Sequence, residues 1–140
     1  MDLIRIFKAI MTALIIVVFI LLLFSAYQHY RFAVSTAGLI DATSTAANDL
    51  VLNDLALREG GTVVAYVIDP TRIDSLSFSK LIGGENLAYR IELSSAETTW
   101  IGGPVDIPEG REACSMELPV VIFENFRHVP GRMRVVLWRA

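Results

Sequence analysis

The sequence predicts an α+β fold in which a long N-terminal helix, first transmembrane and then amphipathic, packs on a small antiparallel β-sheet of four to five strands. Residues 9–27 contain no charged side chain, and apolar residues recur at helical spacing beyond that run. From Thr62 onward, short apolar stretches alternate with turns rich in Gly and Pro. We therefore expect an N-terminal membrane segment at residues 1–32, an amphipathic helix at residues 33–60 and an extracytoplasmic sheet domain at residues 61–140.

The apolar run near the N-terminus is long enough to cross a membrane. A helix over residues 9–27 rises roughly 28 Å, close to the hydrocarbon thickness of a bilayer, about 30 Å. A cleaved secretory signal has a shorter apolar region, about 7–15 residues, and then a small-residue site. Here the bulky Tyr27, Tyr30 and Phe32 follow the run. The pattern favours an uncleaved span over the alternative, a cleaved signal.

Charge and cysteine content restrict the partners and the environment. Arg5 and Lys8 precede the span, and this small positive bias favours a cytoplasmic N-terminus with the C-terminal domain outside the cell membrane. The net charge of −3, without a basic stripe, argues against a nucleic-acid partner. A single cysteine, Cys114, cannot form an intramolecular disulfide. We expect it to be a small buried residue on a strand; a reactive thiol or a bridge between chains is the alternative.

The helical pattern continues beyond the membrane run to about Arg58. Apolar residues keep the three-four spacing of an amphipathic helix, and Gly60-Gly61 supplies the positive φ that ends helices. This helix is the available cover for the apolar face of the sheet. The residues expected to pack on the sheet include Leu39, Ala46, Leu50 and Leu57.

The remainder of the chain reads as short strands and turns. The expected strands are residues 62–69, 87–94, 98–102, 113–126 and 133–140. A short helix is expected at residues 72–85, with Asp74 as its N-cap and Gly83-Gly84 after its end. Pro119 belongs at a sheet edge or bulge, and Pro130-Gly131 suits the middle of a turn. Trp100 and Trp138 are expected to pack in the core or on the sheet, rather than to anchor a partner.

The sequence shows no pattern that predicts catalysis. His29 and His128 have no second histidine or cysteine at metal-ligand spacing. Ser77 and Lys80 satisfy S-x-x-K, but the supporting motifs of serine penicillin-binding enzymes are absent. We therefore expect no enzymatic activity, no cofactor, no metal and no small-molecule substrate; a membrane-tethered enzyme or ligand-binding module is a third, less favoured alternative.

The layout of a lipid-buried and then amphipathic helix before a small sheet resembles type IV pilins, and most of all archaeal pilin-like and minor-pilin-like proteins. In that family a short basic leader ends in Lys or Arg followed by Gly or Ala, and a membrane peptidase cuts there, just before the apolar helix. Lys8 and Ala9, followed by Ile10, stand at the matching position. Bacterial pilins carry a Glu five residues into the mature chain, where this sequence has Leu14, so the bacterial subtype is disfavoured. The layout is also similar to the pseudopilins of tight-adherence systems.

The resemblance implies a structural subunit of a type IV pilus-like filament or of its assembly system. The expected partners are membrane lipid and either other pilin-like subunits or one membrane complex. The alternative is a single-pass accessory subunit that binds one membrane or cell-surface complex and does not polymerise. The two differ at Lys8-Ala9, because a pilin is processed there and an accessory subunit keeps Met1.

Overall fold

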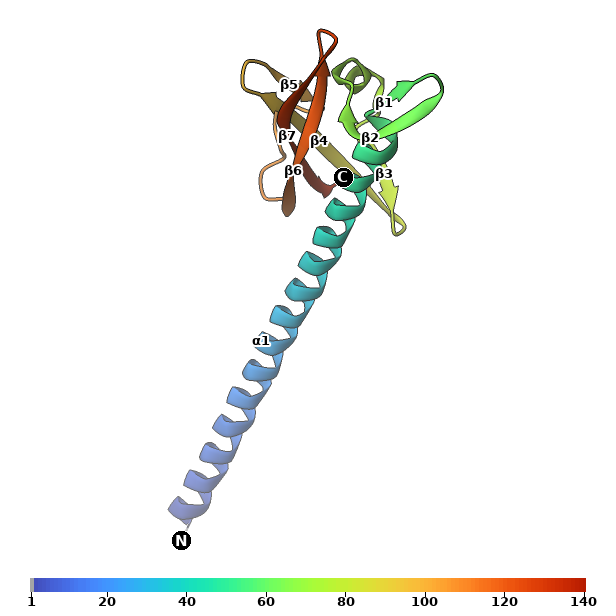
Figure 1. Cartoon of the computed structure of the whole chain (residues 1–140). Helices are drawn as coiled ribbons and strands as arrows, with labels where there is room; N and C mark the ends of the chain where they lie inside the picture. Colours follow the sequence, from blue (N-terminus) through green and yellow to red (C-terminus); the bar gives the residue numbers. More distant parts are fainter. Residues whose placement is uncertain (1) are drawn as a thin grey trace. The chain divides into compact units, whose positions relative to one another are not determined.

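The computed structural model describes residues 2–140 and comprises two compact units, residues 2–37 and Gly38–Ala140 (Figure 1), each of which is described by itself. Helix α1 (Asp2–Asp49) supplies the whole of the first unit and the first element of the second. Residues 2–37 contain neither Gly nor Pro, so nothing in their sequence interrupts helical hydrogen bonding.

The second unit is the end of α1 followed by a seven-stranded sheet. Its elements are η1 (Leu50–Asp54), β1 (Ala56–Glu59), β2 (Thr62–Ile68), η2 (Pro70–Ser75), β3 (Ser79–Ile82), β4 (Glu85–Ser95), β5 (Thr99–Gly102), β6 (Ala113–Glu124) and β7 (Arg127–Arg139). The strand order is β1-β2-β6-β7-β4-β3, with β5 also paired to β4. The α+β class is confirmed, but the sheet has seven strands instead of four to five, and β2 pairs with β6 in parallel.

The main apolar core lies between α1 and one face of the sheet. The register places Tyr89 opposite Leu137 and Ile91 opposite Val135, so these side chains share the face that α1 covers. The predicted alternation of β4 is therefore confirmed. The same core receives Leu39, Ala42, Ala46 and Ala47 from α1, and Leu50 and Val51 from η1.

A second, smaller buried region lies on the opposite face of the sheet. Val136 and Trp138 are 5% and 3% exposed, yet they do not belong to the main core. The loop at residues 103–112 is tied down beside them, since Arg90 donates to the carbonyl of Val105 and the Arg111 guanidinium donates to the carbonyl of Arg139 at 2.7 Å. The expectation that Trp138 packs on the sheet is confirmed, on the face away from α1.

The predicted end of the amphipathic helix is wrong by about nine residues. Regular α-helix stops at Asp49, η1 forms one wider turn, and the N–H of Leu55 closes it on the carbonyl of Leu50 at 2.9 Å. Residues 56–59 are then strand β1, so Leu57 is buried on a strand and not on a helix. Leu57 follows Leu50 by seven residues, a helical spacing, and Leu55 by two residues, a strand spacing, so the pattern over this short stretch did not distinguish helix from strand.

Paired glycines form hairpin turns here, not helix ends. Glu59 pairs with Thr62 and Ile82 pairs with Glu85, which leaves Gly60-Gly61 and Gly83-Gly84 as two-residue loops with positive φ throughout. This is the conformation of type I′ hairpin turns, in which Gly is favoured.

The short helix predicted at residues 72–85 is also wrong. Its first part is the 3₁₀ helix η2, and its second part is strand β3. Asp69, not Asp74, caps η2, because its carboxylate accepts hydrogen bonds from the N–H and hydroxyl of Thr71 at 3.2 Å and 2.7 Å. Pro70 suits the start of η2 because proline has no backbone N–H that would need an acceptor there.

Of the two predictions made for prolines in the last hairpin, the one for Pro119 is correct and the one for Pro130 is wrong. Pro119 lies on β6 before its pairing with β2 begins at Val121, so this part of the strand is a sheet edge, as expected. Pro130 and Gly131, by contrast, lie inside β7. The turn is formed by Asn125 and Phe126, which have φ of 49° and 60°.

Candidate functional site

The apolar surface of residues 2–37 is the most unusual functional feature of the chain. Every side chain from residue 2 to residue 34 is exposed, including Phe19 at 60%, Leu22 at 63% and Phe24 at 61%. The apolar residues surround the helix on all sides instead of forming one stripe. A helix of this kind is stable only in lipid or among other apolar helices. By length and composition α1 is able to cross a membrane, consistent with a single-pass membrane protein.

Each end of the apolar run has a polar contact within the helix. At the N-terminal side, the hydroxyl of Thr12 donates to the carbonyl of Lys8 at 2.8 Å, which satisfies the polar group without a partner from outside the helix. At the other side, the guanidinium of Arg31 lies 5.9 Å from the ring centre of Tyr27. A cation beside an aromatic ring is typical of the interfacial zone of a membrane.

The predicted processing residues lie in the same helix. Lys8, Ala9 and Ile10 are all α-helical and exposed. The predicted packing residues, in contrast, are buried in the second unit: Leu39, Ala46 and Leu50 belong to the main core, and Leu57 lies on β1.

Three charged residues connect the end of α1 to strand β3. The ammonium of Lys80 donates to the carboxylate of Asp49 and, at 3.2 Å, to that of Asp54. The hydrogen bond from Lys80 lowers the pKa of Asp49, against the opposing effect of burial. Burial disfavours the charged form of Lys80, but its bonds to Asp49 and Asp54 outweigh this and raise its pKa. Asp49 and Lys80 are therefore charged at neutral pH, and the contacts of Lys80 with Asp49 and Asp54 hold the β3–β4 hairpin against the helix.

The outer face of β4, β7 and β6 carries alternating charges. Glu92 lies 3.1 Å from the guanidinium of Arg90 and 3.7 Å from that of Arg134. Arg132 faces Glu117 across β7 and β6 at 3.6 Å. The charges of this face are mutually paired, so it presents no concentrated field of one sign to a ligand.

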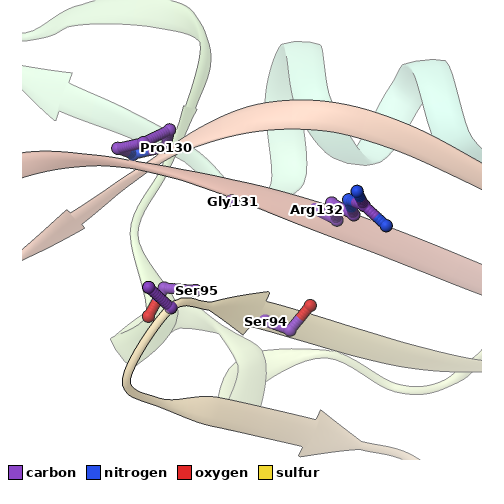
Figure 2. Close-up of a pocket in the computed structure, with 6 residues that line it drawn as sticks. Ser94, Ser95, Pro130, Gly131 and Arg132 are labelled. Carbon is purple, nitrogen blue, oxygen red and sulfur yellow. The ribbon is translucent and has the colours of Figure 1, made fainter.

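A shallow pocket of about 390 Å³ lies where β4 and β7 end their pairing (Figure 2). Ser94 and Ser95 on β4 face Pro130, Gly131 and Arg132 on β7 across it. The hydroxyl of Ser95 already accepts a hydrogen bond from the N–H of Thr98 at 3.1 Å. The Ser95 hydroxyl thus serves the adjacent turn, and the guanidinium of Arg132 pairs with Glu117 at 3.6 Å.

A second pocket of about 390 Å³ lies between α1 and the β3–β4 hairpin. Its lining is formed by Thr45, Ala46, Asp49, Lys80, Leu81, Ile82 and Gly83. The Leu81 side chain is 73% exposed at its rim, and Ile82 packs against the main core at its base. This pocket combines apolar walls with the Asp49–Lys80 ion pair.

The β6–β7 hairpin ends in an exposed aromatic residue. Phe126 is 95% exposed and has a left-handed backbone, with φ of 60°. For a residue with a bulky side chain this conformation costs about 1–2 kcal/mol relative to glycine. The rings of Phe126 and Phe123 are 6.4 Å apart at right angles, but that contact leaves Phe126 almost wholly in solvent. No sequence pattern singled out Phe126, because Asn-Phe is not a usual hairpin signal.

The other side chains that the sequence singled out make contacts within the fold. Cys114 is a free, partly buried thiol on β6 against the core, and Trp100 packs there too. The hydroxyl of Ser77 donates to the carbonyl of Ser79 at 3.1 Å, whereas Lys80 is engaged by acids. Among residues 2–140, no group of three or more His, Cys, Asp or Glu side chains is arranged to hold a metal ion.

Comparison of the chain with protein families, with curated proteins and with solved structures gave no match.

Proposed function

We propose that this protein is a structural, non-enzymatic pilin-like subunit of a type IV pilus-like filament or of its assembly system. The observation that carries the proposal is the helix of residues 2–37, whose apolar side chains surround it and find no partner within the described chain. Such a surface suits storage in a bilayer and later packing among copies of the same helix.

The proposal separates the role of a membrane anchor from that of a filament spine. In lipid, apolar surface alone does not favour protein contacts over acyl chains, so association depends on close van der Waals fit. A spine therefore requires its particular side chains, whereas an anchor requires only a matching hydrophobic length. The small residues Ala9, Ala13, Ser25 and Ala26 near the two ends of the run are positions where helices could approach closely.

In this proposal the C-terminal unit lies outside the cell membrane and the N-terminus lies in the cytoplasm. Arg5 and Lys8 on the N-terminal side support that orientation. Processing at Lys8-Ala9 would remove these charges and leave an apolar helix end free for packing.

Replacement of residues 10–26 by a Leu/Ala span of equal length tests the proposal. We expect the replaced protein to insert into membranes normally but to yield no filaments in the fraction sheared from cells. Val105→Ala, an exposed position in the loop at residues 103–112, is the control and should leave filaments unchanged. Normal filaments from the replaced protein would show that the helix is only an anchor.

The intact mass of the protein from native membranes provides a second, independent test. A mass that lacks residues 1–9, as expected from a cut at Ala9, supports processing by a pilin-type peptidase. A chain that retains Met1 and co-purifies with one membrane complex after the helix replacement would identify a non-polymerising accessory subunit instead.

A further inference from the structure

Strand β6 has an open edge along its first part. β7 pairs with β6 over its whole length, but β2 reaches the other side of β6 only at Val121 and Ile122. Within the described residues 2–140, residues 113–120 therefore have a strand neighbour on one side alone. The terminal strands β1 and β3 are shorter, at four residues each. Native proteins usually keep exposed edges short, because their unpaired N–H and C=O groups attract other chains.

The edge stays open because β2 turns away from β6. Tyr66 lies directly before the paired residues of β2 and has φ of 63°, a left-handed conformation that is unfavourable for a bulky residue. The pairing of β1 with β2 also changes register close to this point. Continuation of the parallel register would have placed residues 62–66 beside residues 116–120. Figure 1 shows the β1–β2 hairpin extending away from β6 instead. Backbone strain of this kind concentrates at functional positions.

The direction of the backbone groups at this edge follows from the β6–β7 hairpin. The loop Asn125-Phe126 has two residues, so the residues that flank it exchange hydrogen bonds, and every second residue of β6 does the same with β7. The intervening residues direct their N–H and C=O groups toward the open edge: Ala113, Ser115 and Glu117. Pro119 belongs to the same set, where its missing N–H leaves the pairing with β7 intact. An extended backbone is the partner that satisfies such a row of donors and acceptors.

The side chains beside the open edge form an apolar and a polar face. Those on the face that α1 covers are half-buried and pack against the main core: Cys114, Met116 and Leu118. On the opposite face, Glu117 pairs with Arg132 at 3.6 Å, so its charge is compensated within the chain. A strand added here would cover the half-buried side chains if its own apolar residues stood at alternate positions.

A second copy of the chain does not suit this edge. Identical edges pair in the antiparallel sense, about a two-fold axis perpendicular to the sheet. Such an axis reverses the direction of residues 38–49 of α1, which lie on one face of the sheet. Two copies paired in this way would have antiparallel α1 helices, whereas copies inserted into one membrane in the same orientation have parallel ones. The extended segment therefore belongs to a different protein.

We propose that residues 113–118 of β6 bind an extended segment of a partner protein, which adds a strand to the sheet. The partner segment has apolar side chains at alternate positions, facing Met116 and its half-buried neighbours, and polar side chains between them. Main-chain hydrogen bonds supply the affinity, and the alternation of side chains fixes the register. This site goes beyond the proposed function, because it lies in the second unit and does not depend on whether the apolar helix is a spine or an anchor.

A synthetic peptide of about nine residues, in which Val alternates with Lys, is long enough to serve as the probe. We expect it to bind the full chain in detergent micelles, measured by the fluorescence anisotropy of a dye on the peptide. A peptide of the same composition with Val and Lys in two separate blocks should bind about tenfold more weakly or worse, because it lacks an apolar face. Equal binding of the two peptides would overturn the proposal.

Ser115→Pro tests the open edge from the side of the protein. The substitution removes an N–H that faces the edge and none that faces β7, so the alternating peptide should bind about tenfold more weakly or worse. Ser115→Ala is the matched control, since it keeps the N–H and should bind the peptide as the parent does. Parental affinity of Ser115→Pro for the peptide would contradict strand addition.

N-methylation of the peptide tests the same hydrogen bonds without any change to the protein. Methylation of the Lys amides should abolish binding of an antiparallel strand, and methylation of the Val amides should abolish binding of a parallel one. In either case the other set of amides points away from β6, and its methylation should be tolerated. Equal effects of the two methylated peptides would show that no strand is added.

Cys114 reports which face of the peptide meets the core. A peptide with Cys in place of a central Val should form a mixed disulfide with Cys114, and a peptide with Cys in place of the neighbouring Lys should not, because alternate side chains point to opposite faces. Mass spectrometry of the full chain under mild oxidation measures both reactions. Equal yields from the two peptides would contradict the proposed register.

Sedimentation equilibrium distinguishes a partner strand from a second copy. If the full chain forms a dimer that the alternating peptide dissociates, a second copy occupies the edge and the proposal is wrong. Peptide binding should persist when residues 10–26 are replaced by the Leu/Ala span, because the site belongs to the second unit. Loss of filaments with retained peptide binding would support both proposals, and normal filaments with retained binding would contradict only the spine.

Discussion

Residues 2–37 and residues 38–140 use similar apolar side chains for opposite purposes. In the first unit, side chains such as Leu22 and Phe24 are more than half exposed. In the second, Leu39 and Leu50 are buried, because polar residues separate the apolar positions into one face that meets the sheet. The comparison teaches that the pattern of apolar residues, more than their number, decides whether a helix completes its own domain or needs an external partner.

The largest effect is expected from removing the helix that the second unit depends on. A chain that begins at Thr62 lacks seven core residues between Leu39 and Leu55, each of which contributes about 1–3 kcal/mol by burial. The sum, roughly 7–20 kcal/mol, is as large as the whole stability of a typical small domain, about 5–15 kcal/mol, so no cooperative thermal unfolding should be seen. A chain of residues 33–140 retains the helix and should unfold cooperatively in circular dichroism. Cooperative unfolding of the shorter chain as a monomer would show that the helix is dispensable to the core.

The next largest effect is expected from a substitution where the strands of the second unit pack closely. A Cβ atom on Gly131 would lie 2.4 Å from Cδ1 of Ile122 and 2.7 Å from the carbonyl oxygen of Ser94. Gly131→Ala should therefore destabilise the protein by about 1–3 kcal/mol in urea unfolding. The matched control is Gly38→Ala, since a Cβ there meets no atom within 4 Å and alanine favours the helix. Equal stability of the two variants would show that the strands relax without cost.

A smaller effect is expected from the ion pairs between α1 and β3. Lys80→Met keeps most of the aliphatic stem but leaves Asp49 and Asp54 without their cation. The free energy of unfolding should fall by about 1 kcal/mol or less, because the Asp49 side chain is 39% exposed. The control is Arg132→Met. It should lower the free energy of unfolding by less, because Arg132 and its partner Glu117 are both more than half exposed. Loss of the same stability by both variants would argue against any special role of Lys80.

The pH dependence of the Lys80 effect follows from the pKa shifts. The pKa of Asp49 is lowered by folding, so its contribution is present above the unfolded value near 3.9 and is lost as the pH falls through the folded value. The pKa of Lys80 is raised, so its contribution is present below about 10.4 and is lost as the pH rises through the folded value. The difference in unfolding free energy between parent and Lys80→Met should therefore be largest between about pH 5 and pH 9, and a flat profile would contradict this.

The smallest effect is expected at Cys114. The thiol is partly buried at the margin of the core and has no disulfide partner, so Cys114→Ala should lower the unfolding free energy by about 1 kcal/mol or less. The self-association of the full chain should be the same with and without a reducing agent. Loss of association under reducing conditions would indicate a bridge between chains.

The sequence by itself determined the features that depend on local patterns. The charge-free residues 9–27 predicted a helix able to cross a membrane, and the alternation of residues 87–94 predicted β4 with its buried face. The three-four spacing of Leu39, Ala46 and Leu50 predicted the helix that covers the sheet. These predictions succeeded because periodicity over many residues has one structural solution.

Only the tertiary structure decided the features that depend on distant partners. Residues 56–59, predicted as helix, form a strand because they pair with β2. The parallel pairing of β2 with β6 joins residues 67–68 to residues 121–122. The bond between Lys80 and Asp49 and the open edge of β6 at residues 113–120 also arise from chain folding. Short segments satisfy helical and strand periodicity equally well, so contacts across the sheet, which no local pattern records, decide between them.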